Sequence, residues 1–367
     1  MREVKWLIVT LLHILLTGLL TAQDVTIKAE YRPEPQRKPL CKPPRINLEA
    51  EALAATHRDA LLRQATVDKL VRVYFHICRN DNGTNAAATL EDIESEFAEL
   101  VADFAPTNIC FANMGVDFVD DTQVNTMLDP DLASNEAWLQ PYLVPGCLNI
   151  FYHANLLNYG GNAYSIPNTY CSIDQGNIGW AHTIAHEVGH CFGLLHTFED
   201  AFGEGYINLA FCTTTGDKVC DTPADPYHED DPCFVSAGCA YVGSCTDPVG
   251  ATNYAPPYTN IMSYWAGEDC TVDELTSGQY ARAHSFLETD IPLLGIQSPA
   301  DLVYGPVMAA SGYVMVSAIH DVSTSGSVEL INNVEASLQG QNVLLLPGFV
   351  ADPTTGRILI RSAACNY

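Results

Sequence analysis

Apolar residues follow different periods along the chain, and these periods predict its elements. Residues 70–78 are almost continuously apolar and rich in Val, Tyr, Phe and Ile, which predicts a buried strand. From Leu90 to Phe104 apolar residues recur at helical spacing, and Thr89 with Asp92 forms a capping pair before them. Further strands are expected at 109–111, 116–119 and 148–153, with an edge strand at 163–166.

The second half of the chain changes pattern twice. A helix is expected at about 180–194, and an irregular stretch from 197 to 260 follows it. Loops of that length are uncommon unless disulfides or ions hold them or function requires them. A last helix is expected at about 276–289. From residue 293 onward short strands replace the helical pattern, which predicts a small β-rich C-terminal segment over 293–367.

The first 67 residues lack the pattern of a folded core. Residues 1–22 combine a charged start, an apolar run and small residues, which is typical of a secretory signal peptide. That run is short for a membrane anchor, and no later stretch is apolar for long enough to span a bilayer. Residues 23–67 begin polar and rich in proline, and we interpret them as a propeptide or linker. We therefore expect a secreted protein whose folded part begins at residue 68.

Charge and cysteine content narrow the function. The net charge of −27 argues against nucleic-acid binding and against docking on anionic lipid, both of which need Lys and Arg. In an exported chain most of the 13 cysteines should be paired as disulfides. An odd count leaves at least one cysteine without a partner in the same chain.

The segment from 186 to 196, H-E-V-G-H-C-F-G-L-L-H, carries the candidate chemistry. His186 and His190 lie four residues apart, so on a helix both face the same side and can bind one metal ion. Gly193 can end the helix with a positive φ and turn the chain, which lets His196 supply a third nitrogen. Three neutral imidazoles leave a fourth position for water, which is typical of a catalytic zinc site. Glu187 would serve as the general base.

A bare H-E-x-x-H pattern is short and often binds nothing, whereas the extended pattern with Gly193 and His196 is far more specific. His182 lies one turn earlier, and we interpret it as a supporting or exposed residue because three ligands are already assigned. Cys191 faces away from the ligands in helical phase, so we expect it in the core or in a disulfide.

With these motifs the chain resembles the metzincin metallopeptidases and, among them, the pappalysin (cytophagalysin) family. The segment N-I-M-S-Y at 260–264 is similar to the methionine turn of metzincins. The resemblance implies that Met262 lies beneath the zinc and that Tyr264 stands near it, where its hydroxyl could donate to a substrate oxyanion. The segments G-D-K-V-C-D-T-P at 216–223 and E-L-T-S-G-Q at 274–279 are also similar to family segments. The likeness spans about residues 70–290.

The resemblance also implies a fold and cofactors. The fold class is α+β: a catalytic domain at 68–292 with a twisted mixed sheet, two long helices and a loop-rich lower subdomain, followed by the β-rich segment. Extended peptide substrate would pair with the edge strand at 163–166. Family members often carry calcium, for which Asp221 and Thr222 are candidates. A plain turn-capping role for Asp221 is the alternative.

Other residues extend these hypotheses. Cys41, in the expected propeptide, could bind the open zinc position and keep a zymogen latent; a disulfide is the alternative. Glu268 and Asp269 follow the methionine turn and could form a pocket that prefers Arg or Lys after the scissile bond; solvated acidic residues are the alternative. For the C-terminal segment, export, surface attachment and stabilisation remain open.

The main expectation is a secreted zinc endopeptidase acting on proteins. The alternatives are a zinc amidase acting on cell-wall peptide and an adhesion or binding protein with a vestigial metal site. The presence of Glu187 argues against the vestigial site, because a relic would be free to lose its base.

Overall fold

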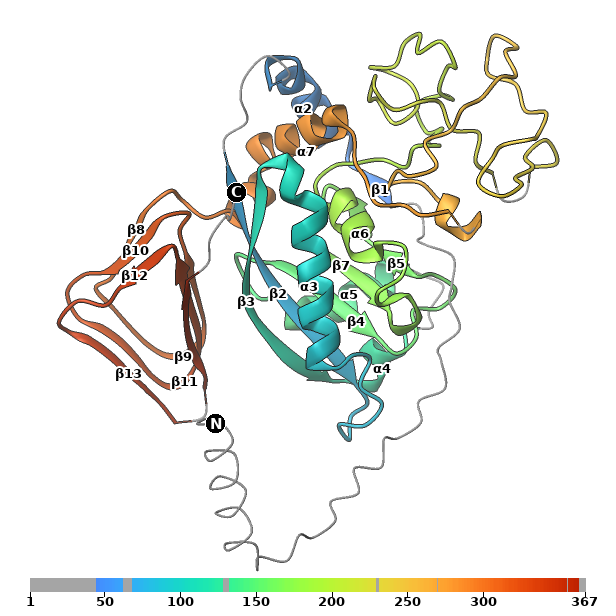
Figure 1. Ribbon diagram of the computed structural model, residues 1–367. Helices are drawn as coiled ribbons and strands as arrows, with labels where there is room; N and C mark the ends of the chain where they lie inside the picture. Colours follow the sequence, from blue (N-terminus) through green and yellow to red (C-terminus); the bar gives the residue numbers. More distant parts are fainter. Residues whose placement is uncertain are drawn as a thin grey trace, which may run out of the picture. The chain divides into compact units, whose positions relative to one another are not determined.

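The computed structural model describes residues 44–61, 68–127, 132–228, 231–268, 270–354 and 356–362. The regular elements up to residue 295, drawn in Figure 1, are β1 (Arg45–Ile46), α2 (Leu48–Leu61), β2 (Lys69–Arg79), α3 (Leu90–Phe104), η1 (Ala105–Thr107), β3 (Ile109–Asp120), α4 (Thr122–Asn125), α5 (Leu132–Leu139), η2 (Gln140–Tyr142), β4 (Leu148–His153), β5 (Gly161–Asn162), β6 (Ser165–Ile166), β7 (Tyr170–Asp174), η3 (Gln175–Asn177), α6 (Thr183–Cys191), η4 (Trp265–Glu268), α7 (Ser277–Thr289) and α8 (Ile291–Gly295). The α+β class expected from the sequence is confirmed.

A five-stranded sheet in the order β3-β2-β4-β7-β5 forms the centre of the fold up to residue 295. All neighbouring strands are parallel except β5, which runs antiparallel to β7, so the sheet is mixed. Strand β2 is apolar almost throughout because both of its faces are buried. Val73 and Phe75 belong to the core under α3 and α6, whereas Leu70 and Tyr74 belong to a cluster on the opposite face.

Several expected elements have different bounds in the structure. Helix α3 begins as predicted, with Thr89 and Asp92 forming a capping box. Helix α6 is shorter than predicted, because Ala181 and His182 before it have φ values of +55° and +54°. The two strands expected between 109 and 119 are one strand, which pairs with β2 along its length. The edge strand expected at 163–166 is wrong in position, because the sheet ends at β5 (Gly161–Asn162) and Ser165–Ile166 form β6, which pairs with β1. Tyr164, whose φ is +60°, separates β5 from β6.

Residues 44–61 pack onto the central sheet and its helices, although the sequence shows no core pattern in this segment. Strand β1 pairs in parallel with β6. Ala50 and Ala54 of α2 are buried in the same core cluster as the central strands, and α2 lies along α7. The expected signal peptide lies outside the described residues, and the domain boundaries stay predictions.

The stretch from 197 to 275 is irregular, as predicted, and among its described residues the one helical element is η4. Disulfides and aromatic rings replace regular structure here. The disulfides join Cys212 to Cys220, Cys233 to Cys245 and Cys239 to Cys270. Cys110 of β3 is also disulfide-bonded.

The C-terminal segment is all β, as predicted, and its described strands are β8 (Leu302–Tyr304), β9 (Val307–Ser317), β10 (Asp321–Thr324), β11 (Val328–Gly340), β12 (Asn342–Leu344), β13 (Phe349–Pro353) and β14 (Ile358–Ser362). The described strands all pair in parallel. Their orders are β12-β10-β8 and β13-β11-β14, with β9 beside β11. The strands therefore stack as successive coils around a small apolar core rather than as hairpins. Among the described residues no helix has the length and apolar character needed to cross a bilayer.

Candidate metal centre

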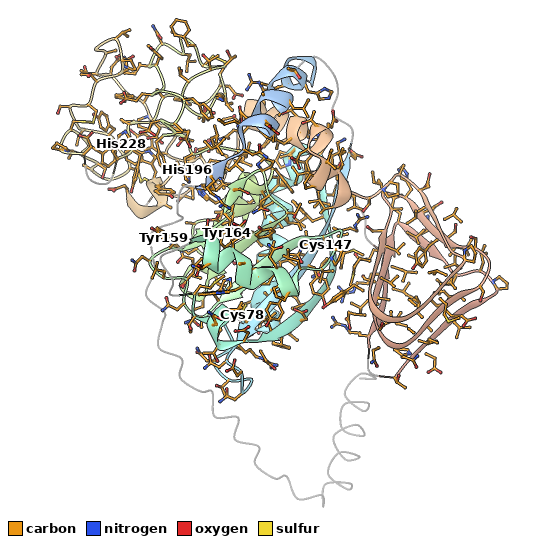
Figure 2. All side chains as sticks on the ribbon, turned by 180° about the vertical axis from the view of Figure 1, so that it is seen from behind. Cys78, Cys147, Tyr159, Tyr164, His196 and His228 are labelled. Atoms are coloured by element: carbon orange, nitrogen blue, oxygen red, sulfur yellow. A yellow bond between two sulfur atoms is a disulfide. The ribbon has the colours of Figure 1, made fainter. Side chains whose placement is uncertain are left out.

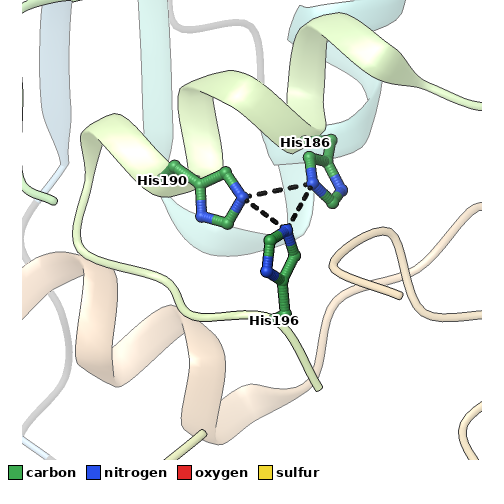
Figure 3. A group of neighbouring side chains, drawn as sticks. All are labelled: His186, His190 and His196. Carbon is green, nitrogen blue, oxygen red and sulfur yellow. Dashed lines mark hydrogen bonds between the residues drawn. The ribbon is translucent and has the colours of Figure 1, made fainter. Parts of the chain in front are cut away.

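Three histidine side chains converge at the end of α6. The Nε2 atoms of His186, His190 and His196 lie 3.0 to 3.3 Å from one another, and all three side chains are buried (Figure 3). His186 and His190 come from one face of the helix, and His196 comes from the segment that follows the turn at Gly193. The three expected ligands are thus brought together with their nitrogen atoms directed at one point.

The far side of two imidazole rings is fixed by main-chain carbonyl groups. His186 Nδ1 donates to the Ile261 carbonyl oxygen at 2.7 Å, and His190 Nδ1 donates to the Leu194 carbonyl oxygen at 2.8 Å. These bonds place the proton on Nδ1 and leave the Nε2 lone pair for a metal ion. Burial lowers the pKa of His186 to about 4 and also lowers the pKa of His190 and His196, so the imidazoles are neutral.

The turn between His190 and His196 depends on Gly193. Its φ is +93°, and a Cβ atom there would lie 2.1 Å from the Phe286 ring of α7. No L-residue with a side chain fits this place without movement of α7. Gly193 therefore allows both the sharp turn and the close approach of α7 to the metal ligands.

Glu187 is fully buried and faces strand β5. A Cβ atom at Gly161 of β5 would lie 2.2 Å from Glu187 Oε1, so the carboxylate occupies the space that the missing side chain leaves. This contact places the expected base between α6 and the edge of the sheet. The importance of Gly161 could not be found from the sequence, where it is one half of an ordinary Gly-Gly loop signal.

The residues of the predicted methionine turn lie against the ligands. Met262 is fully buried, and its sulfur would lie 2.6 Å from a Cβ placed at Gly189 of α6. Its carbonyl oxygen accepts from the Thr197 amide at 3.1 Å, which ties the turn to the segment that carries His196. The Tyr264 ring centroid lies 5.9 Å from that of His186 and 4.9 Å from that of His196. Met262 thus packs against the helix that carries two of the histidines, and the Tyr264 ring lies beside His186 and His196.

An acidic pocket of about 290 Å³ opens beside the third ligand. Phe198 forms part of its wall and stacks on His196, with 4.8 Å between ring centroids. Four acidic side chains and one histidine are also among its lining residues, namely Glu199, Glu204, Asp225, Asp231 and His228. Figure 2 labels His228 and the metal-site residue His196. Asp225 also accepts from Thr197 Oγ1 and from Trp265 Nε1, and burial raises its pKa to about 6. Only the general acidity of the chain hinted at this pocket.

Other predicted site residues lie elsewhere. Glu268 accepts a hydrogen bond from Ser236, and it is not among the described residues that line the acidic pocket. Asp221 accepts from Thr276 Oγ1 at 2.7 Å and from the Gly278 amide at 2.8 Å, so it caps α7. His182 Nδ1 lies 2.9 Å from Asp103, away from the three ligands. Cys191 is buried in the core. Cys41 and Asp269 lie outside the described residues.

Comparison with known proteins identifies the family. The chain is 30% identical over 268 residues to an extracellular metalloprotease of Podospora anserina, covering 65% of this chain and 81% of that protein. It is 31% identical over 268 residues to an extracellular metalloprotease of Verticillium alfalfae, covering 66% and 83%. A stretch of 124 residues is 34% identical to human Pappalysin-1, covering 31% and 7%. The chain belongs to the pappalysin-type family of metallopeptidases.

This pappalysin-type chain is a secreted metalloendopeptidase that uses a metal ion and acts on peptide substrates. No family model matches the chain. Among solved structures it is similar to Tannerella forsythia promirolysin, with a TM-score of 0.47 and 19% identity over 68% of this chain and 91% of that one.

Proposed function

We propose that this enzyme is a zinc-dependent endopeptidase in which His186, His190 and His196 bind the ion and Glu187 is the general base. The separation of the three Nε2 atoms, 3.0 to 3.3 Å, carries the proposal. Zinc–nitrogen bonds of about 2.0–2.1 Å in a tetrahedral site place the nitrogens about 3.3–3.4 Å apart. Three buried neutral imidazoles, two of them with the proton fixed on Nδ1 by a main-chain carbonyl group, are a donor set that zinc prefers.

The bound zinc would supply a water molecule of lowered pKa and polarise the substrate carbonyl. Glu187 would accept the proton of that water and deliver it to the leaving amine. Its position against Gly161 puts it next to the edge of the sheet, where extended substrate would pair with the main chain. Tyr264, beside His186 and His196, would donate a hydrogen bond to the oxyanion that forms at the attacked carbonyl.

A casein digestion assay tests this proposal. Wild-type enzyme should cleave casein, lose activity in a zinc chelator and regain it when zinc is added. Glu187→Ala should lose at least about 1000-fold in kcat, because proton transfer by a positioned base contributes about 10²–10⁴-fold. The same variant should still bind one zinc ion per chain. Cleavage that is indifferent to chelator would contradict the proposal, and cleavage of cell-wall peptide alone would favour the amidase.

We also propose a preference for Arg or Lys in the substrate, and the acidic pocket supports it. Its carboxylates could receive a guanidinium or ammonium group next to the metal centre. The sequence pointed instead to Glu268 and Asp269 for this role, and both assignments can be tested together.

Profiling with a peptide library separates the two candidates. Glu199→Gln should reduce cleavage at basic residues about 10-fold relative to neutral ones, because one charge-assisted contact is lost. Asp200→Asn, an exposed neighbour outside the pocket, is the matched control. A change seen only in Glu268→Gln would assign the preference to the turn after Met262 instead.

We also propose a calcium ion near residue 222, with Asp217 and Thr222 as ligands in place of Asp221 and Thr222. Asp217 Oδ2 and Thr222 Oγ1 are buried without a hydrogen-bond partner among the described residues, and both residues line a small cavity of about 20 Å³. Burial raises the pKa of Asp217 to about 7, a cost that a cation would offset. Added calcium should raise the Tm of the wild type and of Asp221→Asn but not of Asp217→Asn. An equal rise in all three would reject the assignment.

Latency through Cys41 remains a proposal. Arg45 and Ile46, which follow Cys41 within five positions in the sequence, pair with β6 close to the edge strand β5, the place proposed for substrate. A Cys41→Ala precursor should be active without processing. Unchanged latency in that variant would show that another segment blocks the site.

A further inference from the structure

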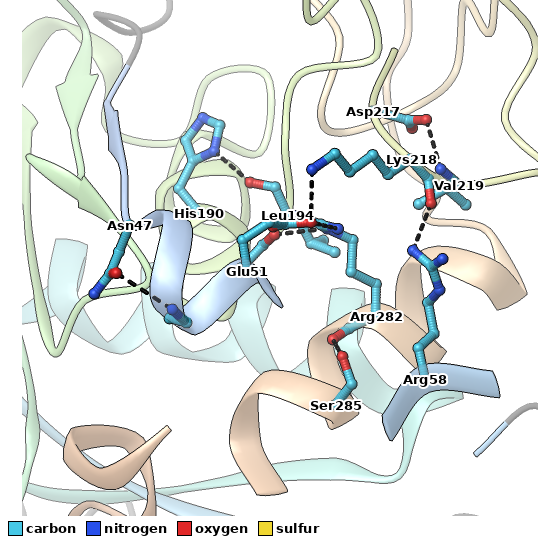
Figure 4. Close-up of polar contacts among 12 residues, drawn as sticks. Asn47, Glu51, Arg58, His190, Leu194, Asp217, Lys218, Val219, Arg282 and Ser285 are labelled. Atoms are coloured by element: carbon cyan, nitrogen blue, oxygen red, sulfur yellow. Dashed lines mark hydrogen bonds and ion pairs between the residues drawn. The ribbon is translucent and has the colours of Figure 1, made fainter. Parts of the chain in front are cut away.

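We propose that Glu51 is a positioning residue for the metal centre, acting through Arg282 on the turn at Gly193. The inference rests on the proposed metal site. It concerns helix α2, which contains no metal ligand and lies in the part of the chain where the sequence predicts a propeptide. Figure 4 shows the polar contacts that link this helix to the turn.

The first link joins α7 to the metal-binding turn. Arg282 Nε donates to the carbonyl oxygen of Gly193 at 2.8 Å. Gly193 lies between two ligands, and the next residue, Leu194, supplies the carbonyl oxygen that fixes His190. Arg282 therefore holds the main chain where its direction decides how His196 approaches the ion. Arg282 is 2% exposed, so water does not compete for this bond.

The second link joins α2 to Arg282. Arg282 Nη1 donates to Glu51 Oε1 at 3.0 Å and Nη2 donates to Glu51 Oε2 at 2.5 Å, so both carboxylate oxygens are used. This paired geometry fixes the plane of the guanidinium group and hence the direction of Nε. Although burial raises the pKa of Glu51, the bonds and charge of Arg282 hold it below its usual value, so the carboxylate is ionised.

Glu51 also balances the charges of two cations, Arg282 and Lys218. Lys218 Nζ also donates to Glu51, at 3.1 Å, and the Lys218 carbonyl oxygen accepts from Arg58 Nη1 at 2.7 Å. Glu51 thus faces two cations in a buried place. Its loss would leave Arg282 and Lys218 near each other without the carboxylate that both of them contact, and buried charges that lose their partner are costly. Arg282 would turn toward water or an alternative acceptor, and Gly193 would lose its donor.

Metal retention should therefore depend on a residue that touches neither metal nor substrate. The neutral variant Glu51→Gln should weaken zinc affinity about 10-fold or more, the range seen when groups that orient metal ligands are lost. Removal of residues 44–61 should have the same effect. It follows that α2 stays with the active enzyme, and that the processing site lies before residue 44.

The experiment compares Glu51→Gln with Glu49→Gln, an exposed position in the same helix. Zinc affinity is measured by competition with a chromogenic chelator, and Tm is measured with and without zinc. We expect weaker zinc binding and a smaller zinc-induced rise in Tm for Glu51→Gln, with Glu49→Gln like the wild type. A purely structural role would lower both Tm values equally and leave zinc affinity unchanged, which would overturn the inference.

Two further measurements keep the test decisive. If Glu51→Gln does not fold, Glu51→Asp retains the charge but withdraws the carboxylate, and it should show the same smaller zinc-induced shift. The N-terminus of the active enzyme, determined by mass spectrometry, should precede residue 44; an active enzyme that lacks α2 would contradict the inference. A wild type that binds no zinc would instead reject the proposed function.

Discussion

The two halves of the catalytic region hold the metal centre by different means. His186 and His190 belong to α6, which is packed against a mostly parallel sheet in an apolar core. His196 opens the irregular half, where three disulfides and a cluster of aromatic rings take the place of regular elements. The first half fixes its ligands by close packing, and the second by cross-links. The metal centre lies where the two meet, so each half can be perturbed separately.

We expect the largest effect from a substitution at Gly193, where the two halves meet. Gly193→Ala would place a Cβ against the Phe286 ring and force an unfavourable φ, so we expect loss of zinc and at least a 100-fold loss in kcat, equivalent to about 3 kcal/mol. Zinc content and casein cleavage measure this. Gly179→Ala, where a Cβ has open space although φ is also positive, is the control for backbone strain alone. Equal effects in both variants would show that contact with α7 is unimportant.

The irregular half should be sensitive to its cross-links. Replacing both Cys239 and Cys270 by serine should lower the unfolding free energy of this half by about 2–4 kcal/mol, because these links restrict a chain with little regular structure. We expect lower activity and faster proteolysis after residue 197, with the far-UV circular dichroism of the sheet retained. Cys147→Ala, a buried thiol under the sheet, is the control. Simultaneous unfolding of both halves would mean that they form one cooperative unit.

In the packed half we expect a smaller effect, a pH dependence of the unfolding free energy that comes from Glu96. Glu96 of α3 is buried and accepts from the Gly179 amide at 2.6 Å, just before α6, and burial raises its pKa to about 7. The unfolded chain loses this proton near pH 4.3, about the reference value. Between these values the folded state holds the extra proton, so stability falls as pH rises toward 7.

Glu96→Gln cannot lose that proton. Its unfolding free energy should match the wild type near pH 4 and exceed it by about 1–3 kcal/mol at pH 8. Urea denaturation at several pH values measures the difference. Glu94→Gln, an exposed position on the same helix, is the control. A difference that does not change with pH would show that the carboxyl is ionised in the folded protein.

The sequence predicted well those features that depend on residues close together in the chain. The helix cap at Thr89 and the ligand pattern from His186 to His196 are carried by residues a few positions apart, so spacing alone determines them. The methionine turn could be placed because its motif is short and specific. The class of the C-terminal segment followed from its period, but the parallel coils did not, since a short apolar strand does not reveal the direction of its neighbour.

What the sequence could not predict depends on contacts between distant segments. Glu51 and Arg282 are 231 positions apart, and neither belongs to a recognisable motif. Asp221 matched a family segment, yet its carboxylate caps α7, while Asp217 in the same segment carries the buried oxygen without a partner. The acidic pocket joins side chains from several loops, whose relative positions depend on the disulfides.

The absence of a side chain at Gly161 has a consequence for how this enzyme can vary. A saturation mutagenesis screen would find position 161 as intolerant as the histidines, although it binds nothing and reacts with nothing. Even alanine there would displace Glu187 while leaving all three ligands in place. Such a variant would be a zinc-loaded, folded and inactive protein. A homologue with an intact zinc motif can therefore have lost its activity through a single methyl group on a strand outside that motif.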